Sequence, residues 1–176
     1  MELIETSDIP PEALKSVQSF LYFVEISQTI LVIGTGPNDL LDKFKKRGFN
    51  VAVVESDATR IKKWKAEGYE IIEGKFEDVG SLKLPKDIGG IWAGSAFEHM
   101  AQSDLEHTLE VLHLILPNKG ALFLSVPKGQ GELREGARVI QFYSEEDLRK
   151  VLEDHNYNIV NLDAHAPSII TAVVTR

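Results

Sequence analysis

Short apolar runs alternate with amphipathic stretches along most of this chain. Four runs are apolar at nearly every position, as expected of strands covered on both faces: residues 29–33, 51–54, 90–93 and 121–126. The amphipathic stretches place apolar residues at helical spacing, and the stretches after the first two runs end at Gly48 and Gly68. Strands that alternate with helices predict right-handed crossovers and a doubly wound, mostly parallel sheet of the α/β class.

The end of the chain departs from this alternation. Residues 157–162 and 169–175 both carry a strand pattern, and the segment between them is too short for a helical crossover. These two strands should therefore pair as an antiparallel hairpin. With a shorter strand at residues 69–72, the pattern predicts a seven-stranded sheet that ends in a C-terminal antiparallel hairpin.

Several helices carry sequence signals for where they begin. Ser56 or Asp57 can cap the helix after the second strand, and Ser144 can cap the last helix. Residues 103–106 read Ser-Asp-Leu-Glu, which predicts a capping box at the start of the helix before the fifth strand. Residues 128–138 are predicted to form a glycine-rich loop.

Length and composition limit the class of protein. A chain of 176 residues is long enough for one buried core, so we expect a single domain over residues 1–176, with residues 1–27 as a helical segment packing on it. The net charge of −8 argues against a nucleic-acid partner. No apolar run approaches the ~20 residues that span a bilayer, and the acidic N-terminus lacks a signal-peptide pattern, so a cytoplasmic protein without a membrane partner is predicted.

The sequence offers few groups for metal or thiol chemistry. Cysteine is absent, which excludes disulfides and a thiolate nucleophile. His107, His113, His155 and His165 show no spacing typical of a metal site, so none is predicted.

The first strand ends abruptly at Gly34-Thr35-Gly36, and an amphipathic stretch follows at once. Glycines at such a turn let a ligand approach the backbone and the helix N-terminus behind it. This is where α/β proteins bind nucleotide-like ligands. The third glycine of the dinucleotide fingerprint is missing, since Asn38 stands there, and the alternative is that the glycines only permit a tight turn.

Glu55 ends the second strand, about twenty residues after Gly34, where nucleotide sites place a carboxylate that accepts hydrogen bonds from ribose hydroxyls. The carboxyl ends of neighbouring parallel strands face one crevice, so the glycine turn and Glu55 are predicted to share a site. The alternative is an acid that only favours the N-terminus of the following helix.

Motifs in the second half of the chain carry a resemblance to a known family. Residues 91–99 (Ile-Trp-Ala-Gly-Ser-Ala-Phe-Glu-His) look like that family's fourth strand and its loop, and residues 116–122 look like its turn into strand five. Residues 124–132 and 141–148 are similar to its small stand-alone members, which act on small molecules. From Thr29 to Arg176 the sequence thus resembles the class I S-adenosylmethionine-dependent methyltransferases.

The resemblance implies a Rossmann-like sheet whose last strand lies antiparallel between the fifth and sixth. It implies S-adenosylmethionine as cofactor and methyl transfer to a small-molecule acceptor. Its family pattern places the methionine part at the glycine turn and the loop after strand four, the ribose on the acid that ends strand two, and the adenine after strand three. The cofactor-binding residues so implied are Gly34, Thr35, Gly36, Glu55, Ser56, Lys75, Phe76, Ala93, Gly94 and Ser95.

His99, just beyond strand four, is the candidate general base for an acceptor that must lose a proton. The alternative is that His99 only packs the loop. Arg138 and Tyr143 are candidate substrate contacts, with loop anchoring as the alternative. Because sulfonium chemistry already supplies a good leaving group, the protein mainly has to align donor and acceptor.

The sequence departs from the family pattern at four positions. Val32 replaces the acid that the family usually has two positions before the first glycine, and Asn38 replaces the third glycine. Lys75 replaces an acid that commonly meets the adenine, and Gly89 replaces the aspartate before strand four. Two hypotheses follow: an enzyme of this family, or a catalytically degenerate member that serves as a binding or interaction module. A nicotinamide-dependent oxidoreductase is disfavoured by the missing glycine and the terminal hairpin.

Overall fold

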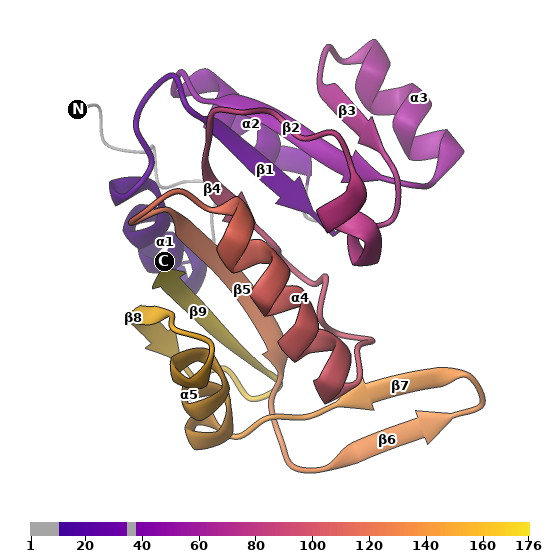
Figure 1. Cartoon of the computed structure of the whole chain (residues 1–176), viewed down its shortest axis with the longest axis vertical. Coiled ribbons are helices and arrows are strands. Elements are labelled where there is room, and N and C mark those ends of the chain that lie inside the picture. The colour runs from indigo at the N-terminus through magenta and orange to yellow at the C-terminus, as the bar shows by residue number, and fades with distance from the viewer. Residues whose placement is uncertain (1–10, 35–37) are drawn as a thin grey trace.

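The computed structural model describes residues 11–34 and 38–176. Its centre is a seven-stranded sheet with the order β3-β2-β1-β4-β5-β9-β8 (Figure 1). The strands are β1 (Thr29–Ile33), β2 (Asn50–Glu55), β3 (Glu70–Glu73), β4 (Ile88–Trp92), β5 (Ala121–Pro127), β8 (Asn158–Asp163) and β9 (Ile169–Thr175). Strands β1 to β5 pair in parallel, and β9 runs antiparallel to both β5 and β8. The predicted fold class is confirmed, including the place of the antiparallel strand.

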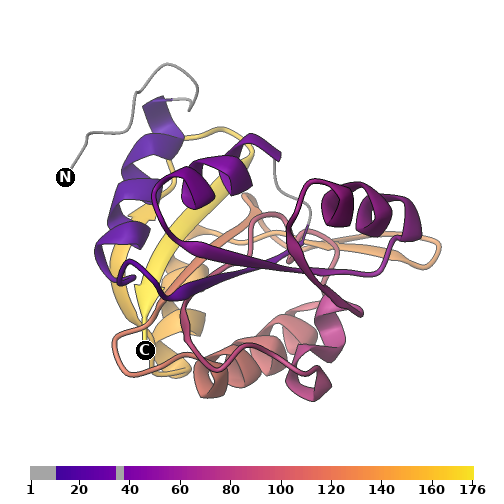
Figure 2. The same ribbon diagram turned by 90° about the horizontal axis from the view of Figure 1, so that it is seen from above.

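Helices cover both faces of the sheet (Figure 2). One face carries α1 (Pro11–Tyr22), α2 (Asn38–Lys46) and α3 (Ala58–Ala66), and the other carries α4 (Gln102–Ile115), α5 (Glu145–Asp154) and the short 3₁₀ helix η2 (Phe76–Ser81). Successive side chains of β1 divide between the two cores: Leu31 and Ile33 belong to the α4–α5 side, and Ile30 and Val32 to the α1–α3 side. This alternation follows from the pleat of a strand. Within the described ranges, no helix combines the length and the apolar character needed to cross a membrane.

Aromatic rings fill the core on the α1–α3 side. Trp92 of β4 stacks on Phe123 of β5 with ring centroids 3.7 Å apart, and Phe20 of α1 meets Trp92 edge to face at 5.2 Å. The Phe20 ring lies over Gly90, where an added Cβ would come within 2.7 Å of it. The glycine in the middle of β4 therefore makes the space in which α1 is seated.

Helix capping follows the sequence in two of the three predicted places. Asp57 accepts a hydrogen bond from the Arg60 backbone N–H at 2.9 Å and caps α3, and Ser144 accepts one from the Asp147 N–H at 3.1 Å and caps α5. The predicted capping box at residues 103–106 is wrong. Helix α4 already begins at Gln102, and its cap position is Ala101, whose side chain has no group to offer.

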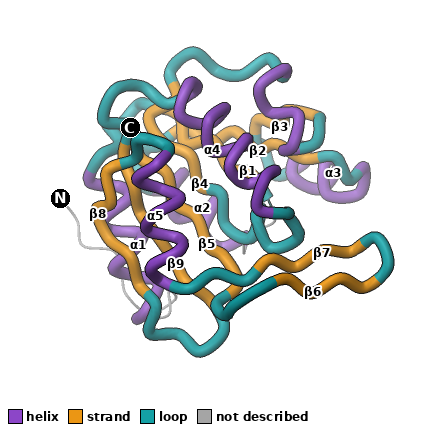
Figure 3. Tube along the Cα trace, turned by 60° about the horizontal axis from the view of Figure 1, so that its bottom comes forward, coloured by secondary structure: helices purple, strands orange, loops and turns teal. Residues whose placement is uncertain are grey.

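A two-stranded arm, built from β6 (Glu132–Glu135) and β7 (Arg138–Gln141), replaces the loop predicted over residues 128–138. Figures 1 and 3 show it extending sideways from the end of β5, on the side of the molecule where the parallel strands end. Its tight turn uses Gly136 at a φ of +62°. The loop prediction missed the pairing because these strands contain few apolar residues, and charged residues separate them. The apolar residues are Leu133, Val139 and Ile140. We call this element the hairpin arm.

Candidate functional site

A cavity of about 410 Å³ lies at the carboxyl ends of the parallel strands. It is bordered by the end of β1, the end of β2, the segment after β3 and the loop after β4. The lining residues are Gly34, Val54, Glu55, Ser56, Arg60, Gly74, Lys75, Phe76, Glu77, Ser95, Ala96, His99 and Met100. The crevice predicted at this edge of the sheet is therefore a real cavity, and seven of the predicted site residues line it.

Gly34 lies where the turn after β1 meets the loop after β4. It has a φ of +78°, and a Cβ at this position would lie 3.0 Å from the backbone and the Cβ of Ala96 in the loop after β4. A side chain would be strained by its backbone conformation and crowded by its neighbour. The turn after β1 can thus approach the loop after β4 only with glycine at this position. Thr35 and Gly36, the other predicted residues of the turn, lie outside the described residues.

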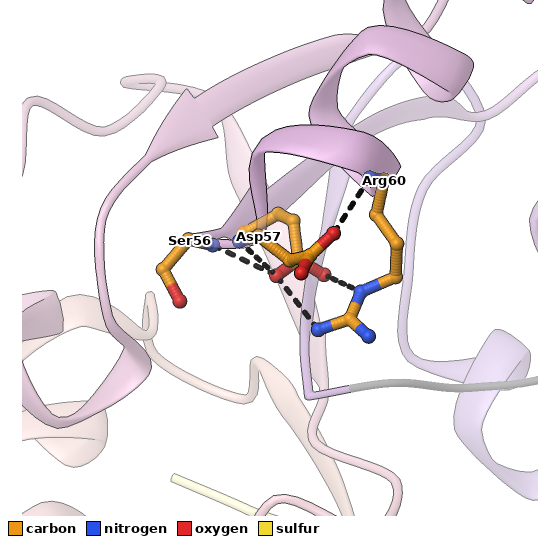
Figure 4. Close-up of polar contacts among 4 residues, drawn as sticks. Ser56, Asp57 and Arg60 are labelled. Carbon is orange, nitrogen blue, oxygen red and sulfur yellow. Dashed lines mark hydrogen bonds and ion pairs between the residues drawn. The ribbon is translucent and has the colours of Figure 1, made fainter.

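Glu55, the last residue of β2, is buried with 6% of its surface exposed. Its Oε1 accepts hydrogen bonds from the backbone N–H groups of Ser56 and Asp57, both at 2.8 Å, and from Arg60 Nη2 at 3.1 Å. Its Oε2 accepts from Arg60 Nε at 2.8 Å. Figure 4 shows the guanidinium forked across both oxygens of the carboxylate. The alternative role for Glu55, an acid near the N-terminus of α3, is thus also part of the observed geometry.

These contacts decide the charge of Glu55. Burial by itself raises the pKa of the carboxyl group, but the hydrogen bonds from Arg60, Asp57 and Ser56, together with the positive charge of Arg60, outweigh it. The net result is a pKa below the ordinary value for glutamate. Glu55 is therefore a carboxylate at neutral pH, and it acts in this site as an acceptor of hydrogen bonds.

The segment after β3 forms the second side of the cavity. The Gly74 N–H donates to the Glu55 carbonyl at 3.0 Å, which ties this segment to the end of β2. Lys75 and Phe76 follow, and both line the cavity. Phe76 is half-buried at the start of η2, where its ring can lie against a planar ligand.

The loop after β4 forms the third side. The Ala93 N–H donates to the Phe123 carbonyl at 2.8 Å, and Gly94 accepts through its carbonyl from the Ser125 N–H at 3.2 Å and the Ser125 hydroxyl at 2.8 Å. Ala93 and Gly94 are thus held against β5, and they are not among the lining residues of the described chain. Ser95 does line the cavity. Of the three residues predicted at this loop, one contributes to the wall and two support it.

His99 lies further along the same loop and also lines the cavity. Arg138 at the tip of the hairpin arm approaches both of its ring nitrogens, with Nε 3.4 Å from Nδ1 and Nη2 3.2 Å from Nε2. The two candidates that the sequence placed 39 residues apart are therefore in contact. The hairpin arm reaches across to the site through this pair.

Tyr143 lies elsewhere. It is buried with 2% of its surface exposed, and its backbone N–H donates to the Pro127 carbonyl at 2.9 Å. It borders a second cavity of about 410 Å³ beside α4 and α5 rather than the cavity that holds Glu55. Burial and the charge of Glu106 raise the pKa of its hydroxyl, which has no hydrogen-bond partner among the described residues. Its backbone and its burial fit the loop-anchoring alternative.

Six lining residues were not among the predicted site residues: Val54, Arg60, Gly74, Glu77, Ala96 and Met100. A signal for Arg60 was present, because it follows Glu55 by five positions and stands in the first turn of α3, behind the capping residue Asp57. Ala96 and Met100 gave no signal, since an alanine and a methionine in a loop have no chemistry that marks them. Among the described residues, no group of three or more acidic or histidine side chains could hold a metal ion.

Comparison with known proteins identifies the family. Residues 7–162 match the family described as "Methyltransferase domain", which is most of the chain. The protein therefore belongs to this methyltransferase family, and the family predicted from the sequence is confirmed. No curated protein matches the sequence of the chain.

Solved structures of methyltransferases share the fold. One is a 1,6-didemethyltoxoflavin-N1-methyltransferase from Burkholderia thailandensis, 16% identical, with a TM-score of 0.69 over 85% of this chain and 71% of that one. Another is an S-adenosylmethionine-dependent methyltransferase from Clostridium acetobutylicum, 12% identical, with a TM-score of 0.71 over 98% and 94% of the two chains. A third, from Mesorhizobium loti, is 12% identical with a TM-score of 0.71 over 93% and 97%. At these identities the likeness concerns the fold.

Proposed function

We propose that the protein transfers a methyl group from S-adenosylmethionine to a small-molecule acceptor. The observation that carries this proposal is the cavity in which a glycine turn, a buried carboxylate and an aromatic ring meet at neighbouring strand ends. In this arrangement Glu55 accepts from the ribose hydroxyls, Phe76 and Lys75 border the adenine, and Gly34 and Ser95 border the methionine part. The methyltransferase family of the chain supports this choice of ligand.

Two neighbours in fold support the cofactor, and one of them also supports a small acceptor. The Burkholderia thailandensis enzyme was crystallised with S-adenosylhomocysteine and 1,6-didemethyltoxoflavin. A glycopeptide N-methyltransferase of the same fold was crystallised with S-adenosylmethionine. In this chain the hairpin arm is a narrow element beside the cavity, which favours a small acceptor over a macromolecule.

His99 is the proposed general base. The sulfonium of the cofactor carries its own leaving group, so the chain has to bind the acceptor in line and take up the proton that it releases. An imidazole at the cavity wall can accept such a proton on the ring nitrogen that Arg138, which is only a donor, frees when its guanidinium turns from His99 to the acceptor. The proton passes from the acceptor to His99 and then to solvent.

Binding is tested by calorimetric titration of S-adenosylmethionine and S-adenosylhomocysteine into the wild type and Glu55→Gln. The substitution keeps the shape and removes the charge, so the dissociation constant should rise about tenfold or more, as expected for a lost charge-assisted hydrogen bond. The matched control is Glu145→Gln, because Glu145 also pairs with an arginine in the first turns of a helix, at 3.5 Å from Arg149. Equal affinity of Glu55→Gln and the wild type, with both proteins folded, contradicts the ribose assignment.

The role of His99 is tested in the same assay once an acceptor has been found by mass spectrometry of methylated products. His99→Gln should leave cofactor affinity unchanged and lower turnover by about 10² or more, the usual worth of a general base. Unaltered turnover removes His99 from the mechanism.

A second candidate function is a non-catalytic binding module of the same fold. The observation in its favour is Val32, which is 2% exposed and packs in the core with Phe44 and Trp92, at the position where the family pattern has an acid. Titration separates the two functions. Folded protein that releases no heat with S-adenosylmethionine at millimolar concentration favours the binding module and excludes the enzyme.

A further inference from the structure

The hydrogen bonds of Glu55 can be counted against its capacity. A carboxylate offers about four acceptor positions, two on each oxygen. Four donors already occupy the group: two backbone N–H groups and Arg60 Nη2 on Oε1, and Arg60 Nε on Oε2. The three donors on Oε1 exceed the two acceptor positions of that oxygen, so Oε1 has no room for another donor. Oε2 receives only one donor and therefore keeps one free acceptor position. A ribose with two neighbouring hydroxyls needs two.

Arg60 is the donor that can leave. The two backbone N–H groups are fixed by the turn between β2 and α3, whereas the Arg60 side chain is flexible and 46% exposed, against 6% for Glu55. Arg60 also lines the same cavity as the carboxylate that it binds. A guanidinium at the mouth of the site can rotate into water without disturbing α3, because its backbone stays in the first turn of the helix.

We infer that Arg60 competes with the ribose hydroxyls for the Glu55 carboxylate and so sets the affinity and the sugar selectivity of the site. This inference rests on the proposed function, in which Glu55 is the ribose acceptor. A ligand with both hydroxyls displaces the guanidinium from at least one oxygen. A deoxyribose, with one hydroxyl, takes the free position on Oε2 and leaves Arg60 in place.

The competition has a measurable consequence for affinity. Arg60→Ala keeps a residue that favours helix and removes the competing donors, so adenosine and S-adenosylhomocysteine should bind about two- to fivefold more tightly, the worth of a half-exposed ion pair. The ratio of the affinities for adenosine and 2′-deoxyadenosine should rise by a similar factor. Arg60→Lys, with a single charged group in place of a fork, should fall between the wild type and Arg60→Ala.

Salt gives an independent measurement, because adenosine is neutral. In the wild type its binding releases an ion pair that salt weakens, so its affinity should rise about twofold between about 0.05 M and about 0.5 M salt. In Arg60→Ala the affinity for adenosine should not rise with the salt concentration. A residue that served only to stabilise α3 could not link salt to the binding of a neutral ligand.

The control is Arg149→Ala. Arg149 is 45% exposed, close to the exposure of Arg60, and pairs with Glu145 on α5, so the change removes an arginine of similar exposure away from the cavity. This variant should bind adenosine like the wild type. Thermal denaturation of each variant verifies folding before titration.

The possible outcomes separate the two proposals. If Arg60→Ala binds adenosine with the same or lower affinity than the wild type, Arg60 does not compete and the inference is overturned, while the proposed function stands. If neither protein binds adenosine, S-adenosylhomocysteine or S-adenosylmethionine, the proposed function fails and the inference fails with it. Tighter binding, a larger sugar ratio and the loss of salt dependence in Arg60→Ala support the inference.

Discussion

Two independent features of the structure require glycine at position 34, and a side chain there would lower stability through each of them. Its φ of +78° disfavours any side chain, and the neighbouring Ala96 leaves no space for a Cβ. Gly131 has nearly the same conformation, with a φ of +77°, but no atom lies within 4 Å of where its Cβ would be. The chain therefore provides one glycine with strain and crowding and a second with strain alone.

Gly34→Ala and Gly131→Ala should differ in stability for this reason. Gly131→Ala should lower the free energy of unfolding by about 1 kcal/mol, the cost of a left-handed backbone with a side chain. Gly34→Ala should lose about 1–3 kcal/mol more, because the loop after β4 must move. Urea denaturation measures both values. Equal losses contradict the argument that Ala96 crowds the turn.

At the scale of elements, the hairpin arm differs from every other strand pair. No residue of β6 or β7 is buried, so the arm adds little to the core. At the base of the arm the two chain segments lie side by side, because the Phe142 N–H donates to the Gly131 carbonyl at 2.9 Å. At its tip Arg138 contacts His99. The arm thus lies outside the core and beside the candidate site.

Shortening the arm tests this division. Replacing residues 133–140 with Asn-Gly closes the base with a favoured two-residue turn. The free energy of unfolding should change by less than about 1 kcal/mol, and cofactor affinity should be retained. Methyl transfer should fall about 10²-fold, because the acceptor loses Arg138, the candidate substrate contact that lies beside His99. Turnover equal to the wild type contradicts a role for the arm.

At the scale of the whole molecule, the sheet separates two cores. The α4–α5 side is built mainly from aliphatic side chains such as Leu105 and Leu109, and the α1–α3 side is centred on the aromatic group around Trp92. Helix α1 is joined to the second core through Phe20, which is fully buried. Helix α1 is therefore packed on the central strands of the sheet.

Phe20→Ala tests whether residues 1–176 unfold as one domain. A buried phenylalanine that is cut back to alanine should lower the free energy of unfolding by about 3–5 kcal/mol. If α1 is part of a single domain, thermal unfolding followed by calorimetry and by the fluorescence of Trp92 and Trp64 should remain one coincident transition at a lower temperature. A separate early transition, with the main one unchanged, contradicts the single-domain prediction.

The sequence by itself determined the parts of this protein that depend on neighbours along the chain. Burial on both faces makes parallel strands continuously apolar, so the runs from Thr29 to Ile33 and from Ala121 to Val126 predicted strands of the sheet. A connection too short for a helix fixed the antiparallel hairpin. The caps at Asp57 and Ser144 were also local, since a side chain reaches an N–H three residues away.

Only the tertiary structure decided what depends on distance in space. The short spacing from Glu55 to Arg60 indicated closeness, but only the folded turn shows a guanidinium forked across both carboxylate oxygens. Ala96 meets Gly34, and Arg138 meets His99, because separate loops converge at the carboxyl edge of a twisted sheet. Periodicity records which side of an element is buried, but it does not record which distant side chain it meets there.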